Sequence, residues 1–249
     1  MIKFFRRIRQ RLLVENKLTQ YLFYAFGEII LVVIGILIAL GVNNLNQQRI
    51  NANREIIILQ ELKEEFSAAA YELNGDLIAR DKYLTICNTL KDYHIYGKPL
   101  SISQDSIKAF LTGVLSVRYY SSAHPVLDDL SSSGGLELIK SSAIRHALAR
   151  YQEERNRYSV VESREADFTY NQVMPFFSTI LDLSKVNENL IPLNEFEDKL
   201  EELKANSTYG SLLQTRMTRL SLASAYGDRI DQTIKDVLAE LEKELSRRL

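Results

Sequence analysis

The stretch "YLFYAFGEIILVVIGILIALGVNN", residues 21–44, decides how the rest of the chain is interpreted. Every residue from Ile29 to Val42 is apolar or glycine, and residues 21–26 extend the segment toward the N-terminus, interrupted only by Gly27 and Glu28. A helix needs about 20 residues to cross a hydrocarbon layer of ~30 Å, so residues 21–42 are long enough to span a membrane. Residues 29–42 have no polar face, which argues against a helix packed on a globular core.

The residues on either side of this stretch predict its orientation. Residues 1–20 carry six basic side chains and one acidic side chain, whereas the other 229 residues carry 25 basic and 31 acidic ones. The excess of basic residues on one side predicts a cytoplasmic tail at 1–20, a transmembrane helix at 21–43 and an exported domain at 44–249. The predicted location is a bacterial inner membrane, with the exported domain in the periplasm. Aromatic residues that suit the membrane interface directly follow the basic tail: Tyr21, Phe23, Tyr24 and Phe26.

A cleavable signal peptide is the alternative to an anchor. Ala39-Leu40-Gly41 fits the small-x-small pattern that precedes a cleavage point. The segment in front of the apolar core would then be 28 residues long and would contain Glu28, so we favour the uncleaved anchor. The exported part is net acidic, the wrong sign for a phosphate backbone, and we expect no nucleic-acid partner.

The composition predicts an all-α fold. Glycine (10) and proline (4) are scarce, which favours long uninterrupted helices. We expect one transmembrane helix that continues into an elongated periplasmic helical bundle. The first long helix of the bundle covers about 45–92, continues the membrane helix and ends before Gly97-Lys98-Pro99. It carries an apolar stripe at Leu59, Leu62, Phe66, Ala69, Leu73 and Leu77.

Five further helices are predicted, together with a polar, tyrosine-bearing loop at 117–124 and a second loop at 131–135. A helix at 104–116 begins after Ser103 as N-cap, and Pro125 opens a short helix. Ser131 to Gly135 is expected to form a loop. The remaining helices cover 142–174, 194–205 and 207–247. Pro175 is expected to end or kink the first of them, and Asn194 is expected to be the N-cap of the second. The last helix repeats apolar or small residues at a spacing of 3–4, as in an elongated bundle: Leu213, Met217, Leu220, Ser224, Gly227, Ile230, Ile234, Leu238, Leu241 and Leu245.

The N-terminal pattern resembles a family of small uncharacterised single-span membrane proteins abundant in Bacteroidetes. The matching elements are Glu15-Asn16-Lys17, Gly27-Glu28-Ile29, the apolar residues 31–40 and Asn43-Asn44. A second segment, Leu127 to Gln152, resembles a later recurring part of that family. Leu45 stands where the family often has tryptophan. The resemblance implies a topology and no known activity.

The sequence gives little support for catalysis. The three histidines, His94, His124 and His146, come from different segments, and no phosphate-binding loop, nucleophile elbow or zinc-protease motif occurs. His124 and Asp128 have a spacing that can place two metal ligands together, but we interpret them as a polar junction before a helix. Cys87 is interpreted as a small buried residue. The acidic runs 61–65 and 195–202 are interpreted as solvated helix faces. We therefore expect no enzyme, cofactor or metal.

Glu28 permits two interpretations. It can be a boundary residue that reaches the membrane surface or is protonated. It can also make a polar contact in an oligomer, or with a basic residue or proton path of a partner.

Three classes of function follow. We favour a membrane-anchored interaction or assembly protein that associates with itself or with another envelope membrane protein. The second class is a periplasmic sensor that signals through a partner and binds a ligand at a loop bearing Arg118, Tyr119, Tyr120 and His124. The third is an accessory subunit of an ion-coupled envelope complex that uses Glu28.

Overall fold

The computed structural model describes residues 18–186 and 190–248, and all regular structure in these ranges is helical. The chain divides into two compact units, Met1–Ile56 and Ile57–Leu249. The predicted all-α fold is confirmed. The predicted division into a tail at 1–20, a transmembrane helix at 21–43 and an exported domain at 44–249 refers to a membrane and stays a prediction.

Helix α2, Leu18–Tyr96, is uninterrupted and contains all of the first unit that the structure describes. Every residue from Ile29 to Val42 is exposed. By length and composition this is the one helix among the described residues that could span a membrane. The prediction that the apolar helix continues into the next long helix is confirmed, and α2 ends where Gly97 adopts φ +62°.

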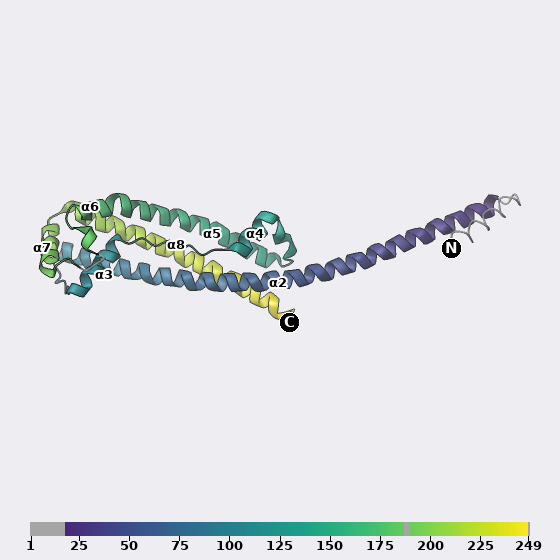
Figure 1. Ribbon diagram of the computed structural model, residues 1–249, viewed down its shortest axis with the longest axis horizontal. Helices are drawn as coiled ribbons and strands as arrows, with labels where there is room; N and C mark the ends of the chain where they lie inside the picture. The colour runs from purple at the N-terminus through teal and green to yellow at the C-terminus, as the bar shows by residue number, and fades with distance from the viewer. Residues whose placement is uncertain (1–17, 187–189, 249) are drawn as a thin grey trace. The chain divides into compact units, whose positions relative to one another are not determined.

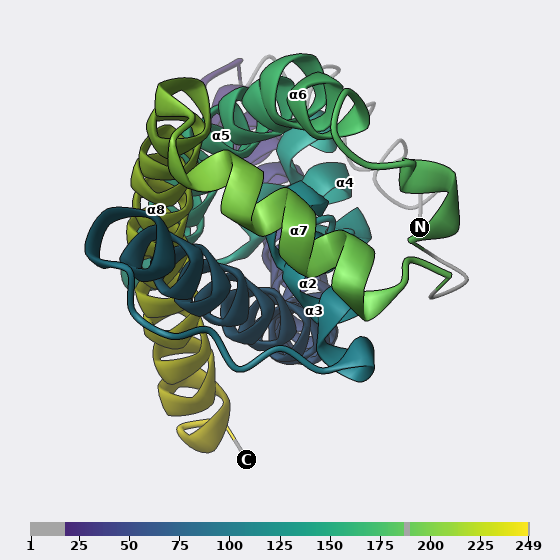
Figure 2. The same ribbon diagram turned by 90° about the vertical axis from the view of Figure 1, so that its left-hand side faces the viewer.

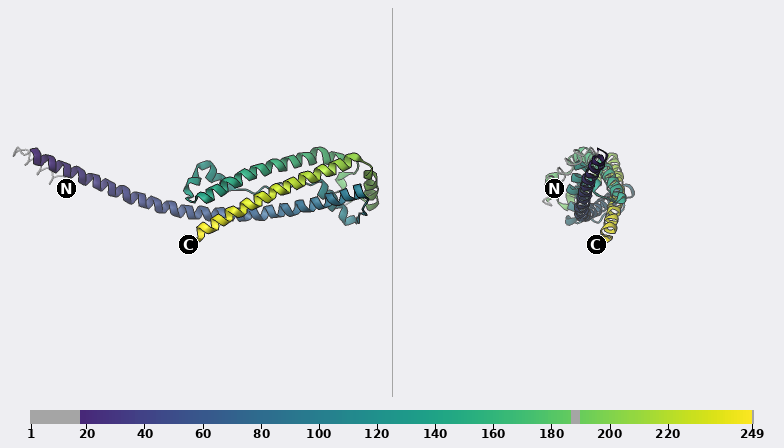
Figure 3. Two further views of the ribbon diagram at one scale, coloured as in Figure 1. Left: turned by 180° about the vertical axis from the view of Figure 1, so that it is seen from behind. Right: turned by 90° about the vertical axis from the view of Figure 1, so that its right-hand side faces the viewer.

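Three long helical segments form the second unit: α2 from Ile57 onward, α5 (Ser142–Phe168) and α8 (Ser207–Ser246). Figure 1 and the view from behind in Figure 3 show α5 and α8 side by side along the unit. The predicted stripe of α2 is buried from Leu59 to Leu73. On α8 most stripe positions are buried, but Ser224 and Leu238 are half-exposed and their neighbours Ala223 and Val237 are buried instead.

Gly227 permits a close contact between these three helices. A Cβ atom on Gly227 of α8 would lie 2.5 Å from Leu77 Cδ2 of α2 and 3.3 Å from the Tyr158 hydroxyl of α5. The contact of the three helices at this position therefore leaves no room for a side chain on α8.

Short helices complete the second unit. Figure 1 shows α3 (Gln104–Leu115), α6 (Met174–Ser178) and α7 (Leu193–Lys204) gathered at one end of it, and Figure 2 shows that end facing the viewer. A buried apolar cluster joins these helices to α2 and α8 and includes Cys87, Leu111, Phe177 and Leu200. Two 3₁₀ turns, Gly135–Leu138 and Leu183–Lys185, link the elements.

The short helices confirm some predicted ends and contradict others. Ser103 caps α3, and Pro125 opens α4 (Pro125–Ser133) as predicted. The loop predicted at Ser131–Gly135 is wrong, because α4 continues to Ser133. The Ser131 hydroxyl donates to the carbonyl of Leu127 at 2.7 Å, and the Ser133 hydroxyl donates to that of Asp129 at 2.7 Å. Serine side chains bonded in this way remain compatible with a helix.

Two further helix ends differ from the prediction. α7 begins at Leu193 with Pro192 as its N-cap, so Asn194 lies inside the helix and the predicted cap is wrong. Pro175 was expected to end or kink its helix. α5 does end at Phe168, a π-helical turn covers Thr169–Val173, and α6 resumes at Met174. The wider turn ends two residues before the proline, whose ring clashes with the preceding turn of an ordinary α-helix.

Candidate functional site

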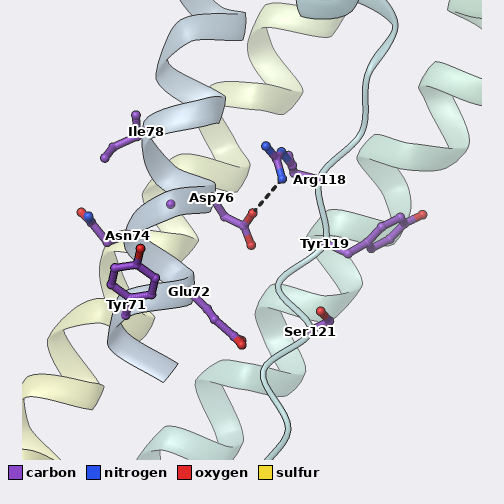
Figure 4. Close-up of a pocket in the computed structure, with 9 residues that line it drawn as sticks. Tyr71, Glu72, Asn74, Asp76, Ile78, Arg118, Tyr119 and Ser121 are labelled. Carbon is purple, nitrogen blue, oxygen red and sulfur yellow. Dashed lines mark ion pairs between the residues drawn. The ribbon is translucent and has the colours of Figure 1, made fainter. Parts of the chain in front are cut away.

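A groove runs between α2 and the segment that joins α3 to α4. Its volume is about 530 Å³, and we call it the α2–loop groove. Figure 4 shows Asp76 of α2 and Arg118 of the connecting segment facing each other, with the Arg118 NH1 nitrogen 3.7 Å from Asp76 Oδ1. The lining residues are Tyr71, Glu72, Asn74, Gly75, Asp76, Ile78, Arg118, Tyr119 and Ser121.

Charge dominates the groove. The Asp76 side chain is 14% exposed and that of Arg118 is 48% exposed. Burial raises the pKa of Asp76, while Arg118 and Arg80 oppose the rise. With Glu72 also on the wall, the groove has two carboxylates and one guanidinium, so it suits a polar ligand with a positive group better than a purely anionic one.

The four residues predicted to share a binding loop separate into two pairs. Arg118 and Tyr119 are exposed and line the groove, and Tyr119 is 49% exposed. Figure 4 shows Tyr119 directed away from Asp76. Tyr120 is half-buried and His124 is 1% exposed, and both are engaged inside the helical unit.

His124 belongs to a buried hydrogen-bonded chain of four side chains. Its Nδ1 lies 3.2 Å from Oε1 of Glu65, and its Nε2 is hydrogen-bonded to the hydroxyl of Tyr151. The Tyr151 hydroxyl is 3.1 Å from that of Tyr120. Phe66 packs edge-on against Tyr151, with ring centroids 4.8 Å apart. These four hydrogen-bonded side chains thereby fix the connecting segment between α3 and α4 against α2 and α5.

Glu65 also caps α4. The backbone N–H of Val126 donates to Glu65 Oε2 at 2.8 Å, and that of Leu127 donates to Oε1 at 3.4 Å. A carboxylate at a helix N-terminus satisfies free N–H groups and interacts favourably with the helix dipole. The Glu65 side chain is only 6% exposed, so the interpretation of residues 61–65 as a solvated face is wrong at this position.

A buried ion network joins the three long helices. Arg80 of α2 donates from NH2 to Glu162 Oε1 of α5 at 2.5 Å, and its NH1 lies 4.0 Å from Glu165 Oε2. Arg216 of α8 is paired with Glu165 and donates from NH1 to Thr169 Oγ1 at 2.5 Å. All four charged residues of this network, Arg80, Glu162, Glu165 and Arg216, are at most 2% exposed.

The network also holds the connecting segment by its backbone. Arg80 donates to the carbonyl of Arg118 at 2.8 Å, and Arg216 donates to that of Ser116. In return, the Tyr120 N–H donates to Glu162 at 3.0 Å. Residues 116–124 have no helical structure, so these buried charges take the place of the missing backbone hydrogen bonds.

Burial shifts the pKa values of the network. Burial raises the pKa of Glu162 more than the Tyr120 N–H and Arg80 lower it. Burial also lowers the pKa of Arg216 to about 10. Both shifts show that the removal of these charges from water costs free energy. The close pairing offsets that cost only while both partners are present.

Our sequence interpretation missed the network, although the apolar stripes contain a signal for it. Arg80 lies seven residues from both Leu73 and Cys87, and thus on the buried stripe of α2. Arg216 lies between Leu213 and Leu220 on the stripe of α8. A charged residue at a stripe position predicts a buried partner, because an unpaired charge is too costly there.

The remaining residues that could do chemistry are dispersed. His124 faces Glu65, whereas Asp128 is exposed and pairs with Arg155 at 3.5 Å, so the structure does not bring His124 and Asp128 together. His94 packs against Tyr209, with ring centroids 5.3 Å apart. No group of three metal-ligating side chains occurs among the described residues.

Cys87 and Glu28 complete the predicted residues. Cys87 is 0% exposed, which confirms the interpretation of a small buried residue, and burial raises the pKa of its thiol to about 11. A thiol with that pKa is a poor nucleophile near neutral pH. Glu28 lies on α2 in the unit Met1–Ile56 and is partly exposed. Its predicted contact in a membrane stays a prediction.

These observations define a class: an all-helical protein with one helix that could span a membrane and a helical unit held together by buried charges. The chain belongs to DUF6090, a family of unknown function whose model matches residues 28–181. The match includes both Glu28 and the segment Leu127–Gln152, and it ends before α7. No curated protein and no solved structure matches the chain. The match is consistent with the expected uncharacterised family, whereas the N-terminal pattern that begins at Glu15 and an origin in Bacteroidetes stay expectations.

Proposed function

We propose that this chain is a membrane-anchored interaction or assembly protein of the bacterial inner membrane without catalytic activity. In this proposal residues 1–20 lie in the cytoplasm, the apolar part of α2 crosses the bilayer, and the unit Ile57–Leu249 lies in the periplasm. The unit associates with a second copy or with another envelope membrane protein.

One observation carries the proposal: the apolar segment Ile29–Val42 is exposed on every side of α2. Its large side chains are 43–68% exposed, including Ile30 at 43% and Leu31 at 68%. A continuous apolar surface of this length is unstable in water and requires a lipid or protein cover. Its length matches the hydrocarbon layer of a bilayer.

The polar residues of the helical unit support an interaction role. The buried ion network and the Glu65–His124–Tyr151 chain are committed to holding helices and the connecting segment together. A unit whose reactive groups are engaged in this way is suited to present a rigid surface to a partner.

Topology provides the first test. A reporter active only in the periplasm is fused after residue 249 of the full chain, and a matched fusion carries the reporter before residue 1. We expect activity from the C-terminal fusion alone. Activity from the N-terminal fusion, or release of a soluble product cleaved near Gly41, would contradict the anchored topology.

Association provides the second test. The full chain is cross-linked in native membranes and purified together with whatever is attached. A control chain carries an unrelated membrane span in place of residues 21–42. Complexes retained by the control assign the contact to the helical unit, and complexes lost in the control assign it to the span. A monomer without attached protein in both chains would overturn the proposal.

A ligand-sensing role is the second candidate, and the α2–loop groove is the observation that favours it. Asp76 and Arg118 present opposite charges on its two walls, so a zwitterionic ligand could replace their mutual contact. Binding of a panel of amino acids to the full chain in nanodiscs tests this role, with Arg118→Gln as the variant. Arg157→Gln serves as the matched control, because Arg157 pairs with Glu153 on the exposed face of α5. Equal binding of the amino acids by both variants would exclude the α2–loop groove as the ligand site.

A further inference from the structure

A second groove, lined by residues of α5 and α8, has the opposite charge. Its volume is about 430 Å³, and we call it the Arg164–Arg219 groove. The lining residues are Val161, Arg164, Gln214, Thr215, Thr218, Arg219 and Leu222. This lining has two guanidinium groups and no carboxylate, although residues 21–249 carry more acidic than basic side chains.

Neither arginine of the groove has an ion-pair partner among the residues that the structure describes. Among the carboxylates of α5 near Arg164 in sequence, Glu162 pairs with Arg80, Glu165 pairs with Arg216, and Asp167 does not line the groove. On α8, residues 207–227 include Arg216 and Arg219 and no acidic residue at all. The lining of this groove therefore carries two cationic side chains and no anionic one.

Two contacts hold the guanidinium of Arg219 in place. Its guanidinium lies over the ring of Phe168 at 4.9 Å, and its NH1 donates to the carbonyl of Arg164 at 3.1 Å. Its Nε is buried and has no hydrogen-bond partner. A planar guanidinium fixed by stacking loses little entropy when it binds a phosphate or carboxylate in a forked geometry.

The groove also has an apolar part. Leu222 is 49% exposed, and the largely buried Val161 also lines the groove. A volume of this size suits a small molecule, and a few polar groups in a partly apolar lining are typical of ligand sites.

We propose that the Arg164–Arg219 groove binds a small amphiphilic anion: a phosphate or carboxylate group that contacts the two guanidinium groups, followed by a short apolar chain that covers Leu222. The anion can come from a soluble metabolite or from the headgroup of an anionic lipid. The site is separate from the α2–loop groove and does not depend on the proposed interaction role.

The test uses the full chain in nanodiscs of phosphatidylcholine and measures binding of hexyl phosphate by equilibrium dialysis. Hexanol tests the apolar chain alone, and inorganic phosphate tests the anion alone. We expect saturable binding of hexyl phosphate, weaker binding of inorganic phosphate and none of hexanol. Absence of saturable binding of hexyl phosphate up to about 10 mM would overturn the proposal.

Two variants assign the site. Arg219→Gln and Arg164→Gln are each expected to weaken hexyl phosphate binding about tenfold, as for loss of one charge-assisted hydrogen bond. Arg164 is exposed, so its replacement leaves the packing intact even if that of Arg219 does not. Arg229→Gln is the matched control, because Arg229 is an exposed arginine of α8 stacked on Tyr226 at 4.7 Å. An unchanged affinity in both groove variants, or an equal loss in Arg229→Gln, would overturn the assignment.

The same binding measurement identifies the source of the anion. Nanodiscs in which phosphatidylglycerol replaces part of the phosphatidylcholine offer a competing lipid phosphate. A lower apparent affinity of the wild-type chain for hexyl phosphate, with no such change in Arg164→Gln, supports a lipid headgroup as the occupant. An unchanged affinity of the wild-type chain supports a soluble anion.

Discussion

Glu162 Oε1 accepts hydrogen bonds both from the guanidinium of Arg80, at 2.5 Å, and from the backbone N–H of Tyr120, at 3.0 Å. A single carboxylate oxygen of α5 thus binds α2 and the connecting segment at once. Because Glu162 is 2% exposed, water cannot replace either partner if one is lost. The stability of the helical unit should depend on this atom more than on any surface ion pair.

The first prediction concerns the Arg80–Glu162 pair. Arg80→Met leaves the carboxylate of Glu162 buried without its main cation, and we expect it to lower the free energy of unfolding by about 3–5 kcal/mol. The double variant Arg80→Met/Glu162→Leu should regain part of that loss, because no unpaired charge remains, but not all of it, because the Tyr120 N–H and the Arg118 carbonyl lose their partners. Denaturant unfolding of the full chain in detergent, followed by circular dichroism, measures both.

The control for this pair is Arg157→Met. Arg157 donates to Glu153 and Glu154 on the exposed surface of α5, where an ion pair contributes about 0–1 kcal/mol. If Arg80→Met costs no more than Arg157→Met, the buried network does not stabilise the fold.

The second prediction concerns pH. Burial raises the folded-state pKa of Glu162 above its ordinary value of 4.5, so between these two values the folded chain binds more protons than the unfolded chain. The contribution of Glu162 to the free energy of unfolding is therefore present at low pH and is lost as the pH rises through the folded-state pKa. The pKa of Asp76 is also raised, so its contribution to the free energy of unfolding likewise decreases as the pH rises.

Comparison with Glu162→Gln isolates this contribution from that of Asp76. The free energy of unfolding is measured from pH 4 to pH 8 for both chains. The wild type minus variant difference should decrease as the pH rises. A difference that increases with pH would show that Arg80 outweighs burial and that the pKa of Glu162 is lowered.

The third prediction compares two adjacent glutamates. Glu65→Ala removes the cap of α4 and leaves His124 without its carboxylate, so we expect a loss of about 1–3 kcal/mol in the free energy of unfolding. Glu64→Ala, one residue earlier at an exposed position, should change it by less than about 0.5 kcal/mol. Thermal unfolding of the two variants tests the difference, and equal effects would contradict the role of Glu65 as a cap.

The fourth prediction uses Cys87, the single cysteine of the chain. With a pKa of about 11, its thiolate fraction at pH 7 is about 1 in 10,000, against ~3% for an ordinary cysteine. Because the thiol is also fully buried, we expect a maleimide to react slowly with the folded chain and rapidly in denaturant. Rapid labelling of the folded chain would mean that the apolar cluster around Cys87 opens easily.

The fifth prediction concerns Glu28, which shares one face of α2 with Leu31, Gly35 and Ile38 by its spacing. If this face contacts a partner helix in the membrane, Glu28→Gln should preserve cross-linked complexes and Glu28→Leu should reduce them. Loss of a cellular phenotype in Glu28→Gln with intact complexes would favour ion coupling. Identical complexes and phenotypes in all three chains would make Glu28 a boundary residue.

Periodicity predicted the framework of the fold well. The stripe from Leu59 to Leu73 and the uninterrupted helix before it were correctly predicted, since a spacing of 3–4 directly reports the buried side of a helix. Local capping patterns were less reliable. Ser103 was correctly predicted as a cap, whereas Asn194 fitted the same pattern and lies inside α7.

The polar interior could not be predicted in the same way. Glu64 and Glu65 look alike in the sequence, and only the arrival of α4 and His124 buries one of them. The partners Arg80 and Glu162 are 82 residues apart, and helical periodicity does not say which charged residues of different helices meet. Arg118 and Tyr119 were correctly placed on a non-helical segment, but the burial of His124 depends on Tyr151 of a distant helix.

The π-helical turn at Thr169–Val173 makes the packing of the helix that follows sensitive to the number of residues in the turn. It adds about one residue relative to an ordinary turn, and one residue corresponds to a rotation of about 100° around a helix. Deleting a single residue there would turn Phe177 away from the apolar cluster while leaving Thr169 beside Arg216. When DUF6090 sequences are aligned, a one-residue gap between positions 169 and 173 should therefore be treated as a change of structure, accompanied by different residues on the face that follows.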